Sequence, residues 1–100
     1  MFEYLVEAYY SPYEPDKTGA DPVDVAGAAD EVTSQGRPVR LIRAIFAPED
    51  ETCFFLFEAG SAEYVTEAAA RSGLRFQRLV ETASVSAFGP TSGHVGRNPR

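Results

Sequence analysis

The chain has 100 residues, of which 44% are hydrophobic and 24% charged, and its formal net charge is -6. This length fits a single domain, and the composition is that of a folded protein rather than a disordered segment. Its single cysteine excludes an intrachain disulfide and a metal site built from several thiolates.

The charge balance also argues against a nucleic-acid partner, because affinity for nucleic acid comes largely from neutralising phosphates. The densest basic stretch holds Arg37, Arg40 and Arg43. Strict strand alternation would divide these side chains between two faces. We therefore expect no binding to nucleic acid.

The opening sequence MFEYLVEAYY lacks the basic segment and hydrophobic core of a secretory signal. The longest uninterrupted apolar stretch is five residues, whereas a membrane span needs about 20. We expect a soluble, cytoplasmic protein with no membrane partner.

The first half of the chain predicts one strand and one helix. Alternating aromatic, apolar and acidic residues predict a strand over Phe2–Tyr9, and prolines and a glycine predict a loop over Tyr10–Ala20. A helix follows, with Asp21 as its N-cap, Pro22 in its first turn and Gly36 at its end.

The middle of the chain predicts a β-hairpin. Strands are expected over Pro38–Phe46 and Thr52–Glu58, joined by the acidic turn PEDE, Pro48–Glu51. The three carboxylates of this turn could hold a cation or could simply be solvated.

The remaining residues predict a second helix, a last strand and a tail. Ser61 is the expected N-cap of the helix and Gly73 its C-terminal stop. The last strand is expected over Leu74–Phe88. The domain would thus cover residues 1–88, and residues 89–100 would form a flexible tail.

The predicted order is β-α-β-β-α-β. Two right-handed crossovers of this kind give a four-stranded antiparallel sheet with both helices on one face. The expected fold is therefore the ferredoxin-like α+β sandwich.

Closing the hairpin at the PEDE turn predicts its register. Arg43 should lie opposite Leu56, and Leu41 opposite Glu58. Arg43 and Glu58 would then be diagonal neighbours on one face, with Cβ atoms roughly 7 Å apart.

Cys53 alternates with Phe55 and Phe57 on the face that should pack under the helices. The same face should hold the apolar residues of the other strands, which are Phe2, Tyr4, Val6 and Ala8 in the first strand and Ile42, Ala44 and Phe46 in the second. Cys53 could be a small buried hydrophobic residue or a nucleophile. A nucleophilic thiol needs a nearby histidine or cation, and the only histidine, His94, lies in the predicted tail. Cys53 is therefore interpreted as a packing residue.

The opposite sheet face should be left without helices, yet it carries apolar residues such as Leu5, Ile45, Phe54 and Leu56. In a single subunit these side chains would contact water. We expect a second subunit to pack against them, sheet to sheet, and to close a cavity.

Charged residues on this face allow two interpretations. If a cavity forms, Glu7, Arg43 and Glu58 must be paired or must contact a ligand, because unpaired buried charge is costly. If the face stays open to water, the same residues form an ordinary solvated strand surface.

Two stretches, YLVEAYY and VRLIRAIFAPEDETCFFLFEAGSAEYVTEAAARSGLRFQRLVE, carry a family resemblance. They resemble the small bacterial ferredoxin-like domains of unknown function that include a nickel-binding protein. The shared features are an arginine-bearing strand, a Pro-acid-acid turn, Thr-Cys-Phe before Phe-Glu-Ala, a capped alanine-rich helix and Ser-Gly-Leu. The resemblance implies a dimer and, for at least one relative, divalent-metal binding. The resemblance matches Glu7 and Glu58 to acidic residues of the family, but it assigns no metal ligands in this chain. Nickel is therefore a candidate cofactor only because of the resemblance.

Our leading hypothesis is a homodimeric ligand-binding domain with its pocket on the helix-free sheet face. Glu7 and Arg43 would hold a small polar or ionic ligand, and Glu58 would pair with Arg43. The apolar wall of the pocket would come from Leu5, Tyr9 and Phe54.

Three other functions stay open. A small cofactor-free enzyme of the cyclase, isomerase or monooxygenase type would use a buried glutamate, with Glu7 the candidate, as its general base. A metal-binding protein would follow the nickel-binding relative. A purely structural dimer is the third, because a fold does not dictate a function.

Overall fold

The computed structural model describes residues 1–10 and 20–83. Its elements in chain order are β1 (Phe2–Tyr9), α1 (Pro22–Ser34), β2 (Val39–Ala47), the short 3-10 helix η2 (Pro48–Asp50), β3 (Thr52–Ala59), α2 (Ala62–Ser72) and β4 (Arg78–Thr82). The predicted loop over 11–19, the predicted strand beyond residue 83 and the predicted tail lie outside the described residues.

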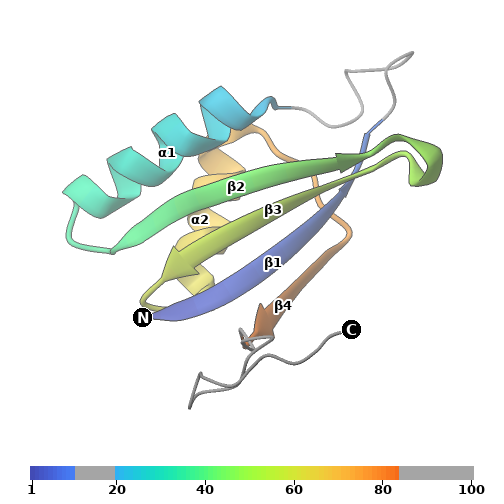
Figure 1. Cartoon of the computed structure of the whole chain (residues 1–100). Helices are drawn as coiled ribbons and strands as arrows, with labels where there is room; N and C mark the ends of the chain where they lie inside the picture. The colour runs from blue at the N-terminus through green and yellow to red at the C-terminus, as the bar shows by residue number, and fades with distance from the viewer. Residues whose placement is uncertain (11–19, 84–100) are drawn as a thin grey trace, which may run out of the picture.

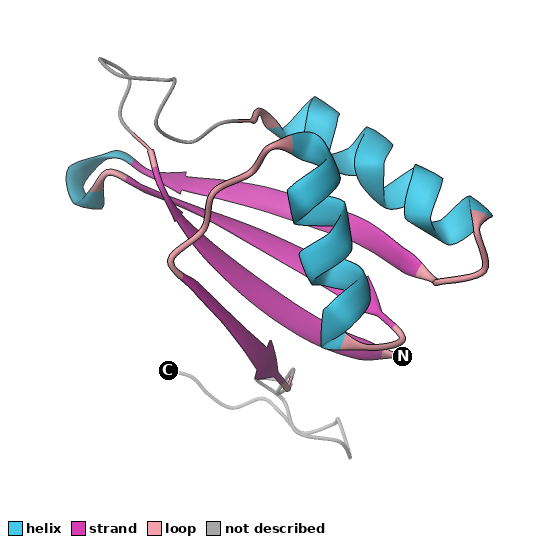
Figure 2. Cartoon of the chain, turned by 180° about the vertical axis from the view of Figure 1, so that it is seen from behind, coloured by secondary structure: helices cyan, strands magenta, loops and turns pink. Residues whose placement is uncertain are grey.

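The four strands form one sheet in the order β2-β3-β1-β4, and each neighbouring pair is antiparallel. Figure 1 views this sheet from its uncovered side, and Figure 2 shows both helices packed against the other side. The predicted α+β class is confirmed, and the arrangement is compatible with a ferredoxin-like sandwich.

Both helices end in the same way, as the glycines predicted. Gly36 and Gly73 have φ angles of 89° and 79°, in the left-handed region that glycine adopts without strain. After α1, the amides of Gly36 and Arg37 donate to the carbonyls of Thr33 and Val32. This pairing is a Schellman motif, and it satisfies carbonyls that would otherwise lack partners.

The two helix starts differ from each other. At α1, the Asp21 Oδ1 accepts a hydrogen bond of 3.0 Å from the Asp24 amide, so the predicted cap is confirmed. Ser61 occupies the N-cap position of α2, but its side chain accepts no capping hydrogen bond. Its Oγ is buried and has no hydrogen-bond partner among the residues described. The predicted N-cap position of Ser61 is therefore confirmed, but no hydrogen bond to its side chain stabilises this helix end.

The last strand begins later than its sequence predicted, at Arg78 rather than at Leu74. The Leu74 amide donates to the Ala69 carbonyl and so completes the end of α2, and the Leu74 side chain is 5% exposed. Residues 74–77 therefore carry the chain from the helix layer back to the sheet. Pairing starts where the Gln77 amide donates to the Glu7 carbonyl at 2.9 Å.

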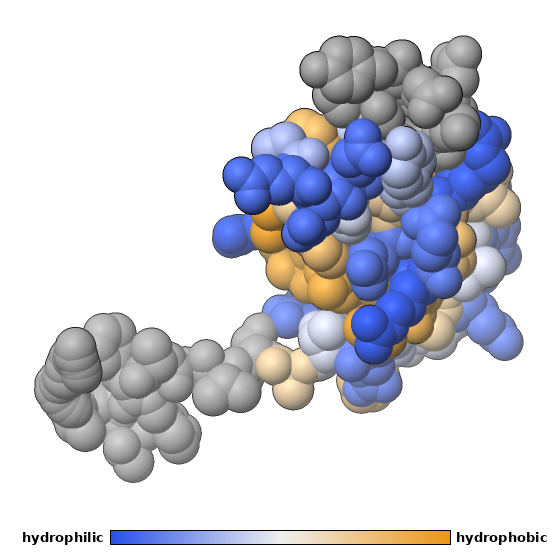
Figure 3. Space-filling view, turned by 90° about the vertical axis from the view of Figure 1, so that its right-hand side faces the viewer, coloured by the Kyte–Doolittle hydropathy of each residue, from blue (hydrophilic) through white to orange (hydrophobic). Residues whose placement is uncertain are grey.

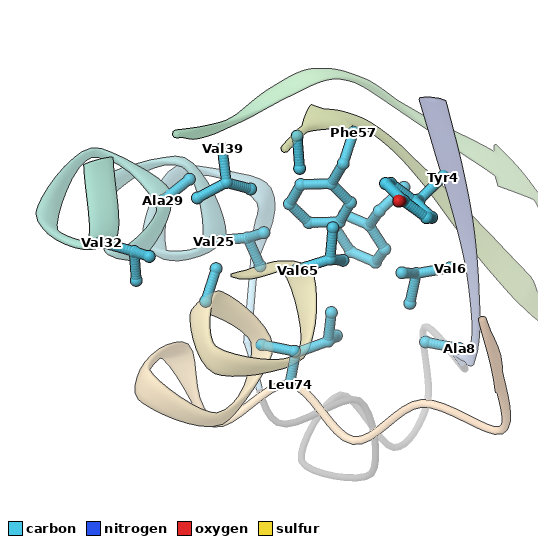
Figure 4. Packing of buried hydrophobic residues seen from close by; sticks show 14 of the residues in the cluster. Tyr4, Val6, Ala8, Val25, Ala29, Val32, Val39, Phe57, Val65 and Leu74 are labelled. Carbon is cyan, nitrogen blue, oxygen red and sulfur yellow. The ribbon is translucent and has the colours of Figure 1, made fainter. Parts of the chain in front are cut away.

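The core lies between the sheet and the two helices (Figure 4). Alternate residues of the two central strands are buried there: Tyr4, Val6 and Ala8 of β1 and Cys53, Phe55 and Phe57 of β3. The helices contribute Val25, Ala29 and Val32 of α1 and Val65, Ala68 and Ala69 of α2. The predicted helix-facing side of the sheet is thus confirmed. Phe2 and Phe46 are exceptions on this side, with 52% and 42% of their surface exposed.

A cluster of charged side chains joins α2 to the segment after α1. The Glu67 carboxylate accepts hydrogen bonds from Arg37, at 2.7 Å, and from Arg71. The hydrogen bond from Arg71 is the main cause that holds the pKa of Glu67 below its usual value. The cluster therefore fixes α2 relative to the entrance of β2.

No helix in the described part of the chain is long and apolar enough to cross a membrane.

Candidate functional site

The side of the sheet turned away from the helices is called the helix-free face below. Its members alternate with the buried residues along each strand: Glu3, Leu5 and Glu7 of β1, Arg40, Arg43 and Ile45 of β2, Phe54, Leu56 and Glu58 of β3, and Arg78, Val80 and Thr82 of β4. Every predicted site residue except Tyr9 is in this set, and Tyr9 follows it at the end of β1.

Apolar side chains form a band across the middle of the helix-free face. Leu5 is paired with Leu56 on one side and with Val80 on the other, and Phe54 lies opposite Ile45. No helix covers this band, and Ile45 is 47% exposed. Figure 3 views the molecule from its hairpin end, the right-hand side of Figure 1, and shows hydrophobic area next to hydrophilic side chains there.

The register of the β2–β3 hairpin differs from the prediction in three of its eight residue pairs, those before the bulge. Arg43 lies opposite Leu56, as expected, but Leu41 lies opposite Phe57. A β-bulge leaves Ile42 without a partner, so every residue before it is displaced by one position. The predicted pairing of Leu41 with Glu58 is therefore wrong.

The bulge gives Glu58 a different ionic partner. Arg40 is the residue opposite Glu58, and its Nε donates to the Glu58 Oε1 at 3.1 Å. The predicted pair between Arg43 and Glu58 does not form. Arg40 and Arg43 also lie on one face, because Ile42 is an extra residue between them and only one paired residue, Leu41, separates them in the ladder. The prediction that strand alternation separates these two arginines is therefore wrong.

Arg43 is left at the margin of the apolar band. It is exposed, and its side chain makes no hydrogen bond or ion pair with any other residue that the structure describes. Its cross-strand neighbour is Leu56, and Ile45 lies two residues further along the same strand. The positively charged side chain of Arg43 therefore borders an apolar surface, and no described residue forms an ion pair with it.

Glu7 lies on the other side of the band. It is paired with Arg78 of β4, at 3.8 Å between Nη1 and Oε1, and its side chain is 37% exposed. Strand β3 separates Glu7 from Arg43. Two strand spacings amount to roughly 10 Å, so the two charged groups lie across Phe54 and Leu56 from each other.

Tyr9 lies at the hairpin end of β1, opposite Thr52. Its hydroxyl is 3.5 Å from the Glu51 Oε1, and its amide donates to the Gln77 Oε1 at 2.7 Å. These contacts attach Tyr9 to the hairpin and to the start of β4. The structure therefore places Tyr9 at the end of the helix-free face and not beside Arg43.

Cys53 belongs to the opposite side of the sheet. It is 7% exposed, and it lines a largely apolar cavity of about 200 Å³ together with Tyr10, Phe46, Phe55 and residues 20–22. Burial raises the pKa of its thiol, which keeps the sulfur protonated near neutral pH. Both features fit the predicted packing role and oppose a nucleophilic one.

Among the described residues, the acids of the PEDE turn do not join others in a group that could hold a metal ion. Residues 48–50 form the 3-10 helix η2, and Glu51 follows it with a left-handed φ of 49°. Within residues 1–10 and 20–83, no three side chains of the His, Cys, Asp and Glu types come together in a way that could hold a metal ion. His94 lies outside this part of the chain.

The members of the helix-free face that the candidate site left out include Arg40, Arg78 and Val80. For Arg40 the sequence carries no local signal. Arg40 and Arg43 are three positions apart in a strand, and an odd spacing places two residues on one face only if an extra residue intervenes. The positions of Arg78 and Val80 on this face follow from the pairing of β4 with β1, and no local sequence pattern specifies that pairing.

Comparison of the chain with protein-family models, with curated proteins and with solved structures gives no match.

Proposed function

We propose that this chain is the subunit of a homodimeric ligand-binding domain with a ferredoxin-like fold. Two helix-free faces would pack against each other and enclose a site for a small molecule. The observation that carries this proposal is the uncovered apolar band of Leu5, Ile45, Phe54, Leu56 and Val80, flanked by charged side chains.

The band favours association because apolar area removed from water contributes about 25 cal/mol per Å². A second copy of the same face supplies a matching apolar surface, as an isologous interface requires. The ion pairs of Glu58 with Arg40 and of Glu7 with Arg78 lie beside the band. Because both pairs are already formed in the single chain, closing the interface would leave neither carboxylate without a partner.

A small molecule would lie over Phe54 and Leu56, the two residues of β3 between Arg43 and Glu7. Arg43 would contact one end of it. Glu7, held by Arg78, would border the other end. Tyr9 would border the enclosed space at the hairpin end of the sheet.

The oligomeric state tests this proposal through two matched substitutions. Ile45→Lys places a charge on the band, whereas Val23→Lys places the same charge on α1, where Val23 is 79% exposed. Both side chains contact solvent in the single chain, so neither lysine should disrupt the fold. Circular dichroism and urea unfolding verify this.

We expect the wild type and Val23→Lys to show twice the 10.9 kDa chain mass in light scattering at micromolar concentration, and Ile45→Lys to show one. A monomeric wild type would refute the proposal. So would a folded Ile45→Lys protein that dimerises as tightly as the wild type, because its dimer would use another surface.

A further inference from the structure

We infer that the ligand of this site is a monoanion, of the carboxylate type with an apolar body, and that Arg43 is the residue that binds its charged group. This inference rests on the proposed function, since it concerns the space that two helix-free faces would enclose. It is carried by how the charges of this face are paired in the structure.

The three arginines of the helix-free face differ in their partners. Arg40 donates to Glu58 at 3.1 Å, and Arg78 lies 3.8 Å from Glu7. Arg43 has neither an ion pair nor a side-chain hydrogen bond with another described residue. When water is excluded, this guanidinium needs an anion, because an isolated buried charge is costly.

The β-bulge at Ile42 is what produces this difference. Without an extra residue, strand β2 would run in the register that the sequence predicted, with Arg43 diagonal to Glu58. With the bulge, Arg40 lies directly opposite Glu58 and pairs with it. Bulges of this kind often re-aim a side chain next to a functional site. Here the bulge moves Arg40 onto the helix-free face opposite Glu58 and leaves the charge of Arg43 without a partner among the described residues.

The neighbours of Arg43 specify the rest of the ligand. Leu56 lies directly across from it, and Ile45 and Phe54 form the next pair toward the hairpin. A guanidinium presents a planar fork of donors that matches a carboxylate in two parallel hydrogen bonds. A molecule with a carboxylate at one end and an aromatic or aliphatic body would satisfy Arg43 and cover these side chains. A cation would be repelled at this end.

Three probes of nearly equal shape separate the alternatives: benzoate, benzamide and benzylamine. Their dissociation constants are measured by NMR titration of the isotope-labelled full chain at low salt, with the oligomeric state determined on the same samples. Arg43→Gln removes the proposed anchor. Arg40→Gln is the matched control, because it removes one positive charge from the same face of the same strand. Cross-peaks of β2 and β3 locate the site.

We expect benzoate to bind at the helix-free face more tightly than the other two probes. Arg43→Gln should weaken benzoate about tenfold or more and leave benzamide unchanged. Arg40→Gln should weaken benzoate by less. The inference is wrong if a dimeric wild type binds none of the probes, or binds benzamide or benzylamine as tightly as benzoate. It is also wrong if the two variants lose benzoate equally. In each of these cases the dimer itself would stand, whereas a monomeric wild type would overturn both the dimer and the anion site.

Discussion

Arg40 and Glu58 face each other across the β2–β3 hairpin, and the arginine Nε donates to the glutamate Oε1 at 3.1 Å. This pair exists because Ile42 has no partner in the ladder. One extra residue therefore decides which of two arginines neutralises Glu58 and which has no ion pair with a described residue. The consequences of this and of three other relationships can be measured.

The ion pair itself should contribute little to folding, because the two side chains are 65% and 33% exposed. Water screens pairs of this kind, and their coupling energies are typically about 0.2–1 kcal/mol. A double-mutant cycle of Arg40→Ala and Glu58→Ala, followed by urea unfolding, should give a coupling in that range. A coupling above about 2 kcal/mol would mean that the pair is far better shielded than the single chain indicates.

Two glycines of the first helical region should respond oppositely to alanine. A Cβ on Gly27 would meet no atom within 4 Å, and the same is true of Gly36. Gly27 lies inside α1, so Gly27→Ala should stabilise the fold by up to about 1 kcal/mol. Gly36 has a φ of 89°, so Gly36→Ala should destabilise it by about 1 kcal/mol. The two unfolding midpoints should move in opposite directions, and a parallel shift would contradict the assigned backbone.

The Cys53 thiol should react slowly with iodoacetamide in the native protein. It is 7% exposed, and burial raises its pKa, so little thiolate exists at neutral pH. Because the folded pKa lies above the unfolded one, this group favours the folded state below the unfolded pKa. This contribution to stability is lost as the pH rises above the unfolded pKa of about 8.5 and through the folded pKa.

The control for this thiol is a protein with Cys53→Ala and Ser34→Cys, which moves the single cysteine to an exposed helix position. It should be alkylated rapidly at neutral pH, whereas the wild type should need denaturant to react at the same rate. Equal rates in the two native proteins would show that Cys53 is accessible.

Because of Glu67, the free energy of unfolding should decrease as the pH falls into the acid range. Its pKa is lowered mainly by the hydrogen bond from Arg71, so in the folded state it holds its proton less tightly than in the unfolded chain. A depressed pKa contributes stability above the unfolded value of about 4.3, and that contribution is lost as the pH falls through the folded value. Urea unfolding between about pH 7 and pH 3 should show a smaller acid loss in Glu67→Gln than in the wild type. Glu49→Gln, in the exposed turn, should retain the wild-type acid dependence.

Much of the fold could be predicted from local patterns. Alternation assigned Tyr4, Val6 and Ala8 to the core, and the structure confirms all three as buried. Gly36 and Gly73 marked the helix ends because their conformations disfavour other residues. The start of β4 was misplaced at Leu74, whose apolar side chain fits a strand pattern equally well but completes the end of α2. A local pattern records that a residue is buried and not which element buries it.

The candidate site was predicted in part. The members of the face could be inferred from the period of two, and Glu7, Arg43, Phe54 and Glu58 do share it. Their partners could not be inferred, because Glu7 is paired by Arg78 from a strand 71 positions later in the chain.

The sequence by itself determined the order of the elements, the helix ends and the helix-facing side of the two central strands, because these follow from backbone preferences and side-chain periodicity over a few residues. Only the tertiary structure decided which charges meet. Ion pairs across a sheet depend on register, and register is the sum of every pairing along the ladder, so a single unpaired residue, Ile42, changes the partner of each residue before it.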